Sequence, residues 1–321
     1  MGEMAQPHPG PGEVLIRIGA SGVNPVDVRR RSGWSGAGYI RSQKRVVTHT
    51  NGAGSVEALG DGVDQKWLGR RVWVWNAGSA SFYGFPDHGT DNGTAAEFIA
   101  LPLRFVAELV DEASFEIGAC LGGPACTAHY VVHADGDVRG STILIQGGTG
   151  SVGGLAVQIA AEAGANIIAV VSSDEKADIA KRYGAHRAIN RSREQVDEAV
   201  LAACPNGVDR IIEVEFGLNV ATDAKLIKPN GKIMSFSSPT VREPRLPYYS
   251  LQRKGVTVQF VQAYILPDAS RIHAINCINS LLRTGKLKPA IAASYPLQQI
   301  AAAHLHVESG RAIGNVIVRI D

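Results

Sequence analysis

The pattern of apolar and polar positions divides the chain into two regions of different character. Between residues 12 and 69, short runs in which apolar and polar residues alternate are separated by Gly, Asn-Pro and Asp-Gly. Alternation with a period of two is typical of half-buried strands, and these turn residues are typical of the tight connections between them. The first region therefore predicts a β-rich module.

From residue 114 onward, apolar runs alternate with glycine-rich turns and with alanine-rich segments of helical spacing. The strands predicted here lie at 142–146, 167–171, 210–214, 232–236, 255–261 and 315–320, and the helices at 152–163, 174–183 and 270–284. Strands that alternate with helices favour a parallel sheet whose strands are joined by crossover helices. We therefore predict an α/β fold with a doubly wound parallel sheet.

One long connection has no period at all. Residues 76–94 combine Gly and Ser with three aromatic side chains and His88. Loops of this length in compact domains are usually functional or mobile. Two interpretations remain open, a lid that faces a substrate and a plain surface insertion.

Composition narrows the class of protein. The 321 residues are 45% hydrophobic and 19% charged, with a formal net charge of +2, which is enough apolar surface for a large core and too little charge for a disordered chain. No block of basic residues offers a footprint for nucleic acid. No apolar run reaches the roughly 18 residues of a membrane span, and the N-terminus lacks a signal pattern. We expect a cytoplasmic protein without nucleic acid or membrane partners.

Cysteine usage points away from thiol chemistry. Cys120, Cys126, Cys204 and Cys277 are scattered without CxxC spacing, which favours reduced thiols over disulfides or structural zinc. Glycine is more informative, because 36 of the 321 residues are glycine, which is more than the usual share of about 7%. Some part of this fold needs main chain close to main chain or to a ligand.

A glycine motif follows the strand predicted at 142–146. The residues of this G-x-G-x-x-G are Gly148, Thr149, Gly150, Ser151, Val152 and Gly153. A strand before the motif and a helix after it are the setting of a dinucleotide-binding turn. The first glycine permits the turn, the second lets the main chain approach a pyrophosphate, and the third lets helix and strand pack closely. The alternative is a glycine-rich turn without a ligand.

The end of the next predicted strand bears on the choice of coenzyme. It reads Val171-Ser172-Ser173, without the carboxylate that binds the ribose of NAD, and Lys176 follows one turn later. Hydroxyls and a cation suit a 2′-phosphate, and Arg191 can add a second cation. We therefore expect NADPH.

An alternative for the coenzyme stays open. In it Lys176 is a solvated helix lysine, and Asp174 or Glu175 turns to bind the ribose of NAD. We also include Ser237, which follows the strand predicted at 232–236, among the candidate cofactor-binding residues.

Several further short motifs occur along the chain in an order that is typical of one protein family. They are residues 9–16 (PGPGEVLI), 22–27 (GVNPVD), 31–33 (RSG), 124–130 (PACTAHY), 184–186 (GAH) with 189–190 (IN), and 303–304 (AH) with 308–311 (ESGR). In this order, and with the glycine motif among them, the chain resembles the zinc-free quinone oxidoreductases, the zeta-crystallin-like branch of the medium-chain dehydrogenase/reductase superfamily. The resemblance covers nearly the whole chain.

The resemblance implies a GroES-like β-barrel catalytic domain built from residues 1–121 and 263–321, and an NADP-binding Rossmann domain at 122–262. It also implies NADPH as coenzyme and a small-molecule acceptor that is electron-poor, either a quinone or an α,β-unsaturated carbonyl compound. In such families the strand near residues 256–261 pairs across a two-fold axis, so the resemblance implies a homodimer.

The same resemblance shows where this chain departs from its relatives. The barrel motif that usually reads Gly-x-acid-x-x-Gly is here 49–54 (HTNGAG), with His49 in place of Gly and Asn51 in place of the acid. Two alternatives stand beside a quinone reductase, and the second of them rests on this departure. One is an enoyl or enone reductase with a non-quinone acceptor, and the other is a non-catalytic, crystallin-like or redox-sensing dinucleotide binder.

A catalytic metal is not expected. Zinc-dependent relatives would carry Cys, His and Cys where this chain has Asn24, Thr50 and Pro124, and zinc sites are built mainly from thiolate and imidazole ligands. His49, and the pair His129 and His133 at helical spacing, are more simply explained by packing or hydrogen bonding.

Without a Lewis acid, quinones and conjugated enones are the easier acceptors, because their charge delocalises as the hydride arrives. The motif positions suggest Asn24 and Asp27 as polar groups near the acceptor, Tyr39 as a hydrogen donor, and Thr127 with Tyr130 against the nicotinamide. Two alternatives remain. Asp27 can instead serve a local turn or pair with a nearby arginine, and Tyr130 can be a core residue.

Overall fold

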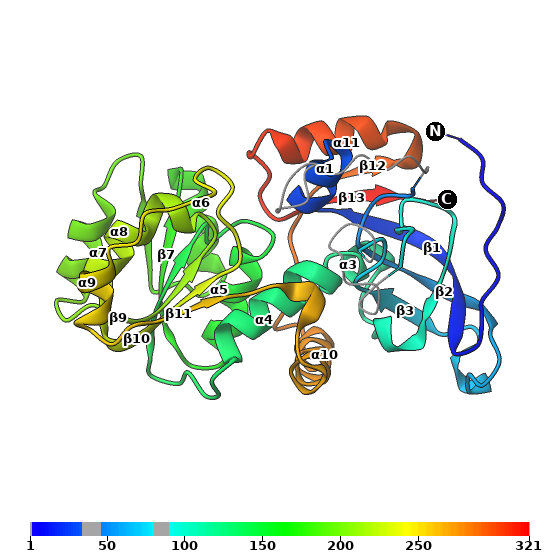
Figure 1. Ribbon diagram of the computed structural model, residues 1–321, viewed down its shortest axis with the longest axis horizontal. Helices are drawn as coiled ribbons and strands as arrows, with labels where there is room; N and C mark the ends of the chain where they lie inside the picture. Colours follow the sequence, from blue (N-terminus) through cyan, green and yellow to red (C-terminus); the bar gives the residue numbers. More distant parts are fainter. Residues whose placement is uncertain (1, 34–45, 80–89, 321) are drawn as a thin grey trace. The chain divides into compact units, whose positions relative to one another are not determined.

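The computed structural model describes residues 2–33, 46–79 and 90–320 (Figure 1). Tyr39 and residues 80–89 of the long aperiodic loop therefore lie outside the described residues. The chain forms two compact units, and each is described separately below. The first comprises Met1–Cys126, Tyr264–Gly285 and Pro289–Asp321, and the second Thr127–Ala263 with Lys286–Lys288.

The first unit is built on a mainly antiparallel sheet. Its strands are β1 (Glu13–Val23), β2 (Asn51–Leu59), β3 (Arg71–Val74), β4 (Phe98–Pro102), β5 (Val106–Glu108), β12 (Ile291–Pro296) and β13 (Asn315–Arg319). They run in the order β12-β13-β1-β2-β3-β5, and β4 also pairs with β1. The sheet thus joins strands from both ends of the chain.

Strand β1 is the centre of this sheet. It pairs with β2 over most of its length, with β4 beside residues 13–17, and with β13 beside residues 20–23. Fully buried side chains such as Ile16, Trp73, Leu101 and Phe105 form the core around it. Burial of each such side chain stabilises the fold by about 1.5–3 kcal/mol, so the unit has its own core.

Helices and helical turns complete the first unit. They are α1 (Pro25–Arg31), η1 (Gln65–Trp67), η3 (Leu103–Phe105), α3 (Phe115–Gly118), η4 (Leu121–Ala125), η5 (Ala263–Ile265), α10 (Asp268–Arg283), η6 (Leu297–Gln299) and α11 (Ile300–Glu308). The chain enters the second unit after Cys126, the first residue of α4 (Cys126–His133).

The second unit is a six-stranded parallel sheet. Its strands are β6 (Thr142–Gln146), β7 (Asn166–Val171), β8 (Arg187–Asn190), β9 (Val208–Glu213), β10 (Ile227–Ser235) and β11 (Thr257–Phe260). They run in the order β11-β10-β9-β6-β7-β8. The direction of winding reverses between β6 and β9, and ligands bind outside the carboxyl ends of such strands at that point.

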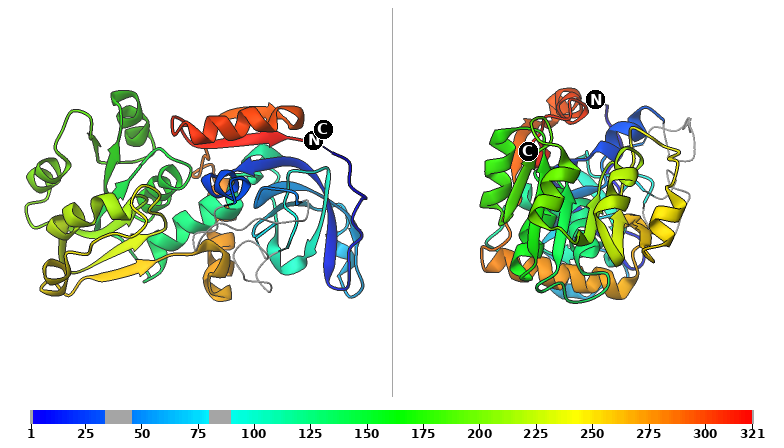
Figure 2. Two further views of the ribbon diagram at one scale, coloured as in Figure 1. Left: turned by 45° about the horizontal axis from the view of Figure 1, so that its top comes forward. Right: turned by 90° about the vertical axis from the view of Figure 1, so that its left-hand side faces the viewer.

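Helices cover both faces of this parallel sheet (Figure 2). They are α5 (Gly153–Glu162), α6 (Asp174–Arg182), α7 (Val196–Ala203), α8 (Phe216–Leu226) and α9 (Tyr248–Gln252). Because both faces are covered, the central strands are apolar on both sides, and Leu144, Ile211 and Ile233 are fully buried. The predicted α/β fold with a doubly wound parallel sheet is confirmed.

The elements that were predicted agree closely with the observed ranges, although several observed helices, α7, α8 and α11 among them, were not predicted. The strand predicted at 142–146 is β6, and the helix predicted at 152–163 is α5. The strand predicted at 255–261 is shorter, because β11 spans Thr257–Phe260. Helix α1 was not predicted, although Asn24 is its N-cap and Pro25 its first residue, both of which are ordinary signals of a helix start.

In the part of the chain that the structure describes, no helix is both long and apolar enough to cross a membrane.

Candidate active site

The glycine motif forms the turn between β6 and α5. The residue with a left-handed backbone is Gly147, whose φ is +69°. A Cβ on Gly148 would lie 2.7 Å from the Cβ of Ala169 on β7, and one on Gly153 would lie 2.1 Å from the carbonyl oxygen of Gly147. Gly147 therefore supplies the left-handed backbone conformation that the turn needs, one residue before Gly148, where it was expected. Gly148 and Gly153 allow strand, turn and helix to pack closely.

Gly150 differs from its neighbours in the motif. The nearest atom to a Cβ placed there is the carbonyl oxygen of Gly147, at 3.4 Å, which is an ordinary contact. The fold itself thus leaves room for a side chain at this position. The absence of one keeps the main chain open to an incoming group, as a pyrophosphate requires.

The other residues of the motif complete the turn at residues 147–153, which we call the cradle. Thr149 is buried, whereas Ser151 and Val152 are partly exposed, and Val152 is the residue before α5. The first N–H groups of a helix have no partner within the helix, and the helix dipole favours negative charge there. The start of α5 can therefore hold the anionic diphosphate of a dinucleotide.

The end of β7 presents hydroxyls and a cation. The Oγ of Ser173 accepts a hydrogen bond from the backbone N–H of Lys176 (3.2 Å) and so caps α6. The Nζ of Lys176 donates to the Oγ of Ser172 (3.3 Å). The ammonium group is thus held beside the carboxyl end of β7. Arg191 follows β8, and its backbone N–H donates to the carbonyl oxygen of Val171 (3.0 Å).

The nearby carboxylates are engaged elsewhere or face solvent. Asp174 Oδ1 accepts from Asn190 Nδ2 (2.7 Å), and its Oδ2 pairs with Arg193 (2.8 Å). Glu175 is exposed on α6. Both oxygens of Asp174 therefore already have partners in this structure.

A buried carboxyl pair lies at the end of β9 and was not predicted. Glu213 is fully buried and accepts from Asn219 Nδ2 (3.2 and 3.1 Å) and from the backbone N–H of Glu215. Asp223, on α8, is also fully buried. Burial raises the pKa of both carboxyls, and the charge of Glu213 raises that of Asp223 further. Each of the two carboxyls therefore makes ionisation of the other less favourable.

Ser237 lies just after β10, at the carboxyl end of the parallel strands, as Glu213 does at the end of β9. Its carbonyl oxygen accepts from the backbone N–H of Phe216 (3.2 Å), which joins this segment to the start of α8.

On α4, Thr127 is buried, and the hydroxyl of Tyr130 accepts from Gln259 Nε2 (3.0 Å). The contact with Gln259 on β11 gives Tyr130 a polar partner, in contrast to a purely apolar core residue.

In the first unit, a cluster of neutral polar groups surrounds Thr50. Its Oγ1 lies 3.5 Å from Asn24 Nδ2 and 3.5 Å from the hydroxyl of Tyr264, and both of these groups are placed to donate to it. Thr50 Oγ1 in turn donates to Asn51 Oδ1 (3.4 Å). Tyr264 was not predicted, because 214 residues separate it from Thr50. All three contacts are long for hydrogen bonds, so each donor can readily turn to a better acceptor.

Asp27 lies beside this cluster in the first turn of α1. Its Oδ2 accepts from the backbone N–H of Asn24 (2.7 Å), which completes a capping box. Asp27 is fully buried, and its Oδ1 has no hydrogen-bond partner among the described residues. Burial raises its pKa to about 7, although Asn24 and the charge of Arg30 oppose the shift. The structure thus gives Asp27 the local turn role and leaves a titratable group near the cluster.

The described residues contain no group of three or more His, Cys, Asp and Glu side chains that could hold a metal ion. His129 and His133 lie one turn apart on α4, with ring centroids 4.9 Å apart. Asn24 and Thr50, where the resemblance to the superfamily implies ligands in zinc-dependent members, offer an amide and a hydroxyl.

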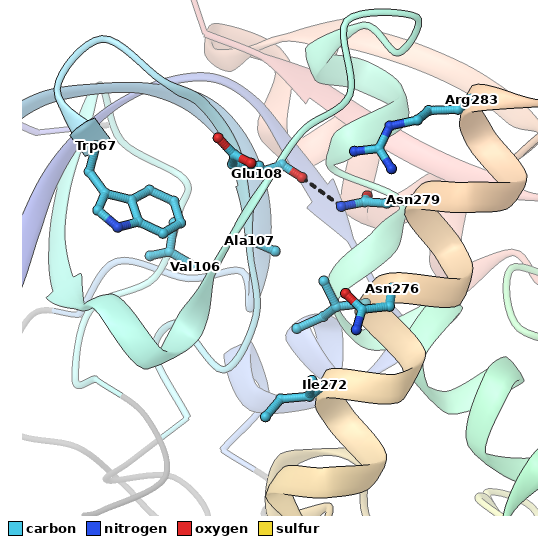
Figure 3. A pocket seen from close by; sticks show the side chains of 9 residues that line it. Trp67, Val106, Ala107, Glu108, Ile272, Asn276, Asn279 and Arg283 are labelled. Carbon is cyan, nitrogen blue, oxygen red and sulfur yellow. Dashed lines mark hydrogen bonds between the residues drawn. The ribbon is translucent and has the colours of Figure 1, made fainter. Parts of the chain in front are cut away.

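A separate pocket of about 450 Å³ lies in the first unit between β5 and α10 (Figure 3). Trp67, Glu108 and Ile272 are among its lining residues, and Asn279 Nδ2 donates to the carbonyl oxygen of Glu108 across one side (3.0 Å). None of the predicted site residues lines this pocket, so it has no part in the candidate site.

Comparisons with known proteins agree with this architecture. The model of the family "Alcohol dehydrogenase GroES-like domain" matches residues 10–111, and that of "Zinc-binding dehydrogenase" matches residues 151–274. The quinone oxidoreductase of Sus scrofa is 29% identical over 324 residues, which cover 98% of this chain and 92% of that protein.

Two solved structures are similar over nearly their whole length. The quinone oxidoreductase of Pseudomonas syringae pv. tomato has a TM-score of 0.85 at 27% identity, covering 99% of this chain and 94% of that one. A mycobacterial protein solved in complex with NADPH has a TM-score of 0.86 at 25% identity, with the same coverage. With its GroES-like unit and its NAD(P)-binding type of parallel-sheet unit, the chain belongs to the zinc-free quinone oxidoreductase branch of the medium-chain dehydrogenase/reductase superfamily.

Proposed function

We propose that this protein is an NADPH-dependent reductase that transfers a hydride to a quinone or to an α,β-unsaturated carbonyl compound, without a metal. The observation that carries the proposal is the cradle at residues 147–153, where Gly150 alone of the three motif glycines has room for a Cβ within the fold. A glycine that packing does not require is explained by a ligand that approaches the main chain there. When bound, NADPH supplies the hydride.

The residues at the end of β7 support NADPH over NADH. Lys176 is held beside Ser172 by a 3.3 Å contact, so a cation and hydroxyls lie together where the 2′-phosphate of NADPH binds in this fold. Arg191 adds positive charge at the neighbouring strand end. Asp174, the carboxylate that could serve NAD instead, is bound by Asn190 and Arg193. Ser237 and the residues of the glycine motif complete the proposed coenzyme site.

The Thr50 cluster supports an acceptor that carries a carbonyl oxygen. Asn24 Nδ2 and the hydroxyl of Tyr264 both point to Thr50 Oγ1 over long contacts of 3.5 Å. A carbonyl oxygen that gains charge as the hydride arrives is a stronger acceptor than a neutral hydroxyl, so it attracts both donors. Tyr39 is proposed as a further donor, and Thr127 and Tyr130 are proposed to contact the nicotinamide.

The donor groups at the positions where zinc-dependent relatives bind the metal support metal independence. An amide, a hydroxyl and Pro124 replace the thiolates and imidazole of a catalytic zinc site. A simple ketone would need a Lewis acid to stabilise an alkoxide, whereas a quinone or enone spreads the incoming charge over its conjugated system. We propose that the donors of the Thr50 cluster serve this second kind of acceptor.

A homodimer is proposed through the edge strand β11. This strand ends the order of the parallel sheet and leaves one row of backbone groups unpaired in the described part of the chain. The Phe260 side chain on it is 67% exposed, and Tyr248 and Tyr249 on α9 are 64% and 73% exposed. Pairing of two β11 strands would satisfy the edge and cover these rings. We propose that this dimer works in the cytoplasm.

A non-catalytic dinucleotide binder is the second candidate, favoured by the departures at His49 and Asn51. One experiment separates the two. The protein is mixed with NADPH and a panel of quinones and enones, and the loss of absorbance of the reduced coenzyme is followed. The proposed reductase oxidises NADPH with at least one acceptor. Tight binding of NADPH without oxidation by any acceptor identifies the non-catalytic binder, and oxidation with enones alone identifies an enone reductase.

A further inference from the structure

A chain of buried hydrogen bonds in the first unit links two histidines to the site. His49 Nε2 lies 2.8 Å from His304 Nε2 of α11, and their rings stack with centroids 5.1 Å apart. His49 Nδ1 lies 2.8 Å from Ser21 Oγ of β1, which lies 2.7 Å from Thr94 Oγ1. Both histidines are at least 98% buried, with exposed fractions of 0% and 2%.

The direction of every bond in this chain follows from its far end. The hydroxyl of Thr94 donates to the carbonyl oxygen of Asn51 (2.6 Å), which can only accept. The single proton of Thr94 is therefore used, so the contact between Ser21 and Thr94 needs the proton of Ser21. Ser21 must then accept from His49, which is protonated at Nδ1.

The same reasoning fixes the other histidine. His49 carries its proton at Nδ1, so its Nε2 is a bare acceptor and His304 must donate from Nε2. Each bond holds one proton, and a second proton on His49 would meet the N–H of His304. Burial and the adjacent His304 accordingly lower the pKa of His49 to about 3. The chain is neutral and has one direction, from His304 to Asn51.

This chain fixes the main chain on both sides of Thr50. His49 has a φ of +72°, a conformation in which glycine is favoured, and its ring is bonded at both nitrogens. On the other side, the carbonyl oxygen of Asn51 accepts from Thr94, and its Oδ1 accepts from the backbone N–H of Gly123 (2.8 Å). The side-chain contacts of Thr50 itself are long, so the fixed main chain determines where its hydroxyl lies.

We propose that His49 and His304 are positioning residues for the hydride acceptor, because their hydrogen-bond chain holds residues 49–51 and thereby aligns Thr50 with the donors Asn24 and Tyr264. The proposal rests on the proposed reductase function and adds two residues to it. It also accounts for His49 at a position where relatives carry glycine. The ring bonds compensate for a backbone conformation that costs a non-glycine residue on the order of 1 kcal/mol.

The charged groups around the pair do not disturb this arrangement. Arg31 of α1 and Glu308 of α11 face His304, and they form an ion pair with each other. The remaining acceptor of the pair is His304 Nδ1, which is buried without a hydrogen-bond partner among the described residues. A proton added there would leave the N–H at Nε2 in place, and burial together with Arg31 lowers the pKa of His304.

The test compares two substitutions at one position. His304→Gln keeps an N–H donor near the place of Nε2, whereas His304→Leu removes it and leaves His49 Nε2 without a donor. His306→Gln, on the same helix but outside the chain, is the matched control. Steady-state kinetics with the best acceptor of the panel give kcat/KM for each protein, and titration with NADPH gives its Kd.

We expect His304→Leu to lower kcat/KM for the acceptor by about tenfold or more, the equivalent of one lost buried hydrogen bond, with the Kd of NADPH unchanged within about twofold. We expect His304→Gln to recover most of that loss and His306→Gln to match the unchanged protein. Equal losses for the Gln and Leu variants at 304 would show that the two histidines serve core packing only, and would overturn the positioning role. Unchanged kinetics in His304→Leu would overturn it as well.

A second measurement does not depend on turnover. Nitrogen-15 spectra of the imidazole rings at neutral pH should show His49 protonated at Nδ1 and His304 at Nε2. The opposite tautomers, or an imidazolium at His49, would overturn the chain. A protein that binds NADPH but reduces no acceptor would overturn the proposed function and the positioning role with it, while these spectra would still decide the chain.

Discussion

Gly150 offers the sharpest perturbation of the coenzyme site, because packing and binding make different demands on it. A Cβ at this residue meets no atom closer than 3.4 Å, and its φ lies outside the left-handed region. A single Cβ is therefore tolerated at residue 150, so Gly150→Ala should change the unfolding free energy by less than about 1 kcal/mol, and Gly150→Val should still fold. The added methyl groups would occupy the space that the diphosphate needs.

The expected loss of affinity follows from the bonds that the diphosphate would forfeit. Hydrogen bonds to a charged group contribute about 1.5–3 kcal/mol each. Loss of two backbone N–H bonds at the start of α5 therefore costs about 3–6 kcal/mol, which corresponds to an increase in the Kd of NADPH of at least about 100-fold. Isothermal titration calorimetry with NADPH measures this directly, and Gly150→Ala should show a smaller increase.

Gly153→Ala is the contrasting control. Its Cβ would lie 2.1 Å from the carbonyl oxygen of Gly147, so this variant should lose stability before it loses affinity. Thermal unfolding of the three proteins separates the two effects. If Gly150→Val is folded and its Kd for NADPH stays within about tenfold of the unchanged protein, the cradle is not where the diphosphate binds and the argument from Gly150 fails.

Three further predictions concern charge, protonation and assembly. Lys176→Ala should raise the Kd of NADPH by about tenfold and leave that of NADH unchanged. Equal effects on both coenzymes would show that the 2′-phosphate does not bind at this end of β7. Burial raises the pKa of Asp27 from 3.8 to about 7, so the folded chain keeps a proton that the unfolded chain has lost, and stability should fall by about 3 kcal/mol as pH rises from 4 to 7. In denaturant titrations across this range Asp27→Asn should lack that part of the slope, and an unaltered slope would show that Asp27 ionises normally. Phe260→Asp should dissociate the proposed dimer in sedimentation experiments without unfolding it, whereas an unchanged sedimentation coefficient would exclude β11 as the dimer interface.

The part of the parallel-sheet unit around the glycine motif could be predicted in detail because its signals are local. A strand, a glycine-rich turn and a helix follow one another within residues 142–163, and each leaves its own pattern in the sequence. The details that failed are equally local in origin. The left-handed residue of the turn is Gly147, and the signals for α1 at Asn24 and Pro25 lie inside a region dominated by strand patterns.

The acceptor side could be predicted less completely, because its contacts join residues far apart in the chain. Tyr264 reaches Thr50 across 214 positions, and His304 reaches His49 across 255. No periodicity or spacing encodes such a pair, so neither contact was foreseen. The carboxyl pair Glu213 and Asp223 was missed for another reason, since each carboxyl lies within a regular element and only burial reveals it.

Direct hydride transfer can be followed most clearly with a labelled coenzyme. NADPH deuterated at C4, prepared separately with the label on either face, is incubated with the protein and an α,β-unsaturated ketone, and the product is examined by mass spectrometry and NMR. The account predicts that one of the two labelled coenzymes places one deuterium on the carbon β to the carbonyl. A reduced product that carries no deuterium from either coenzyme would contradict it.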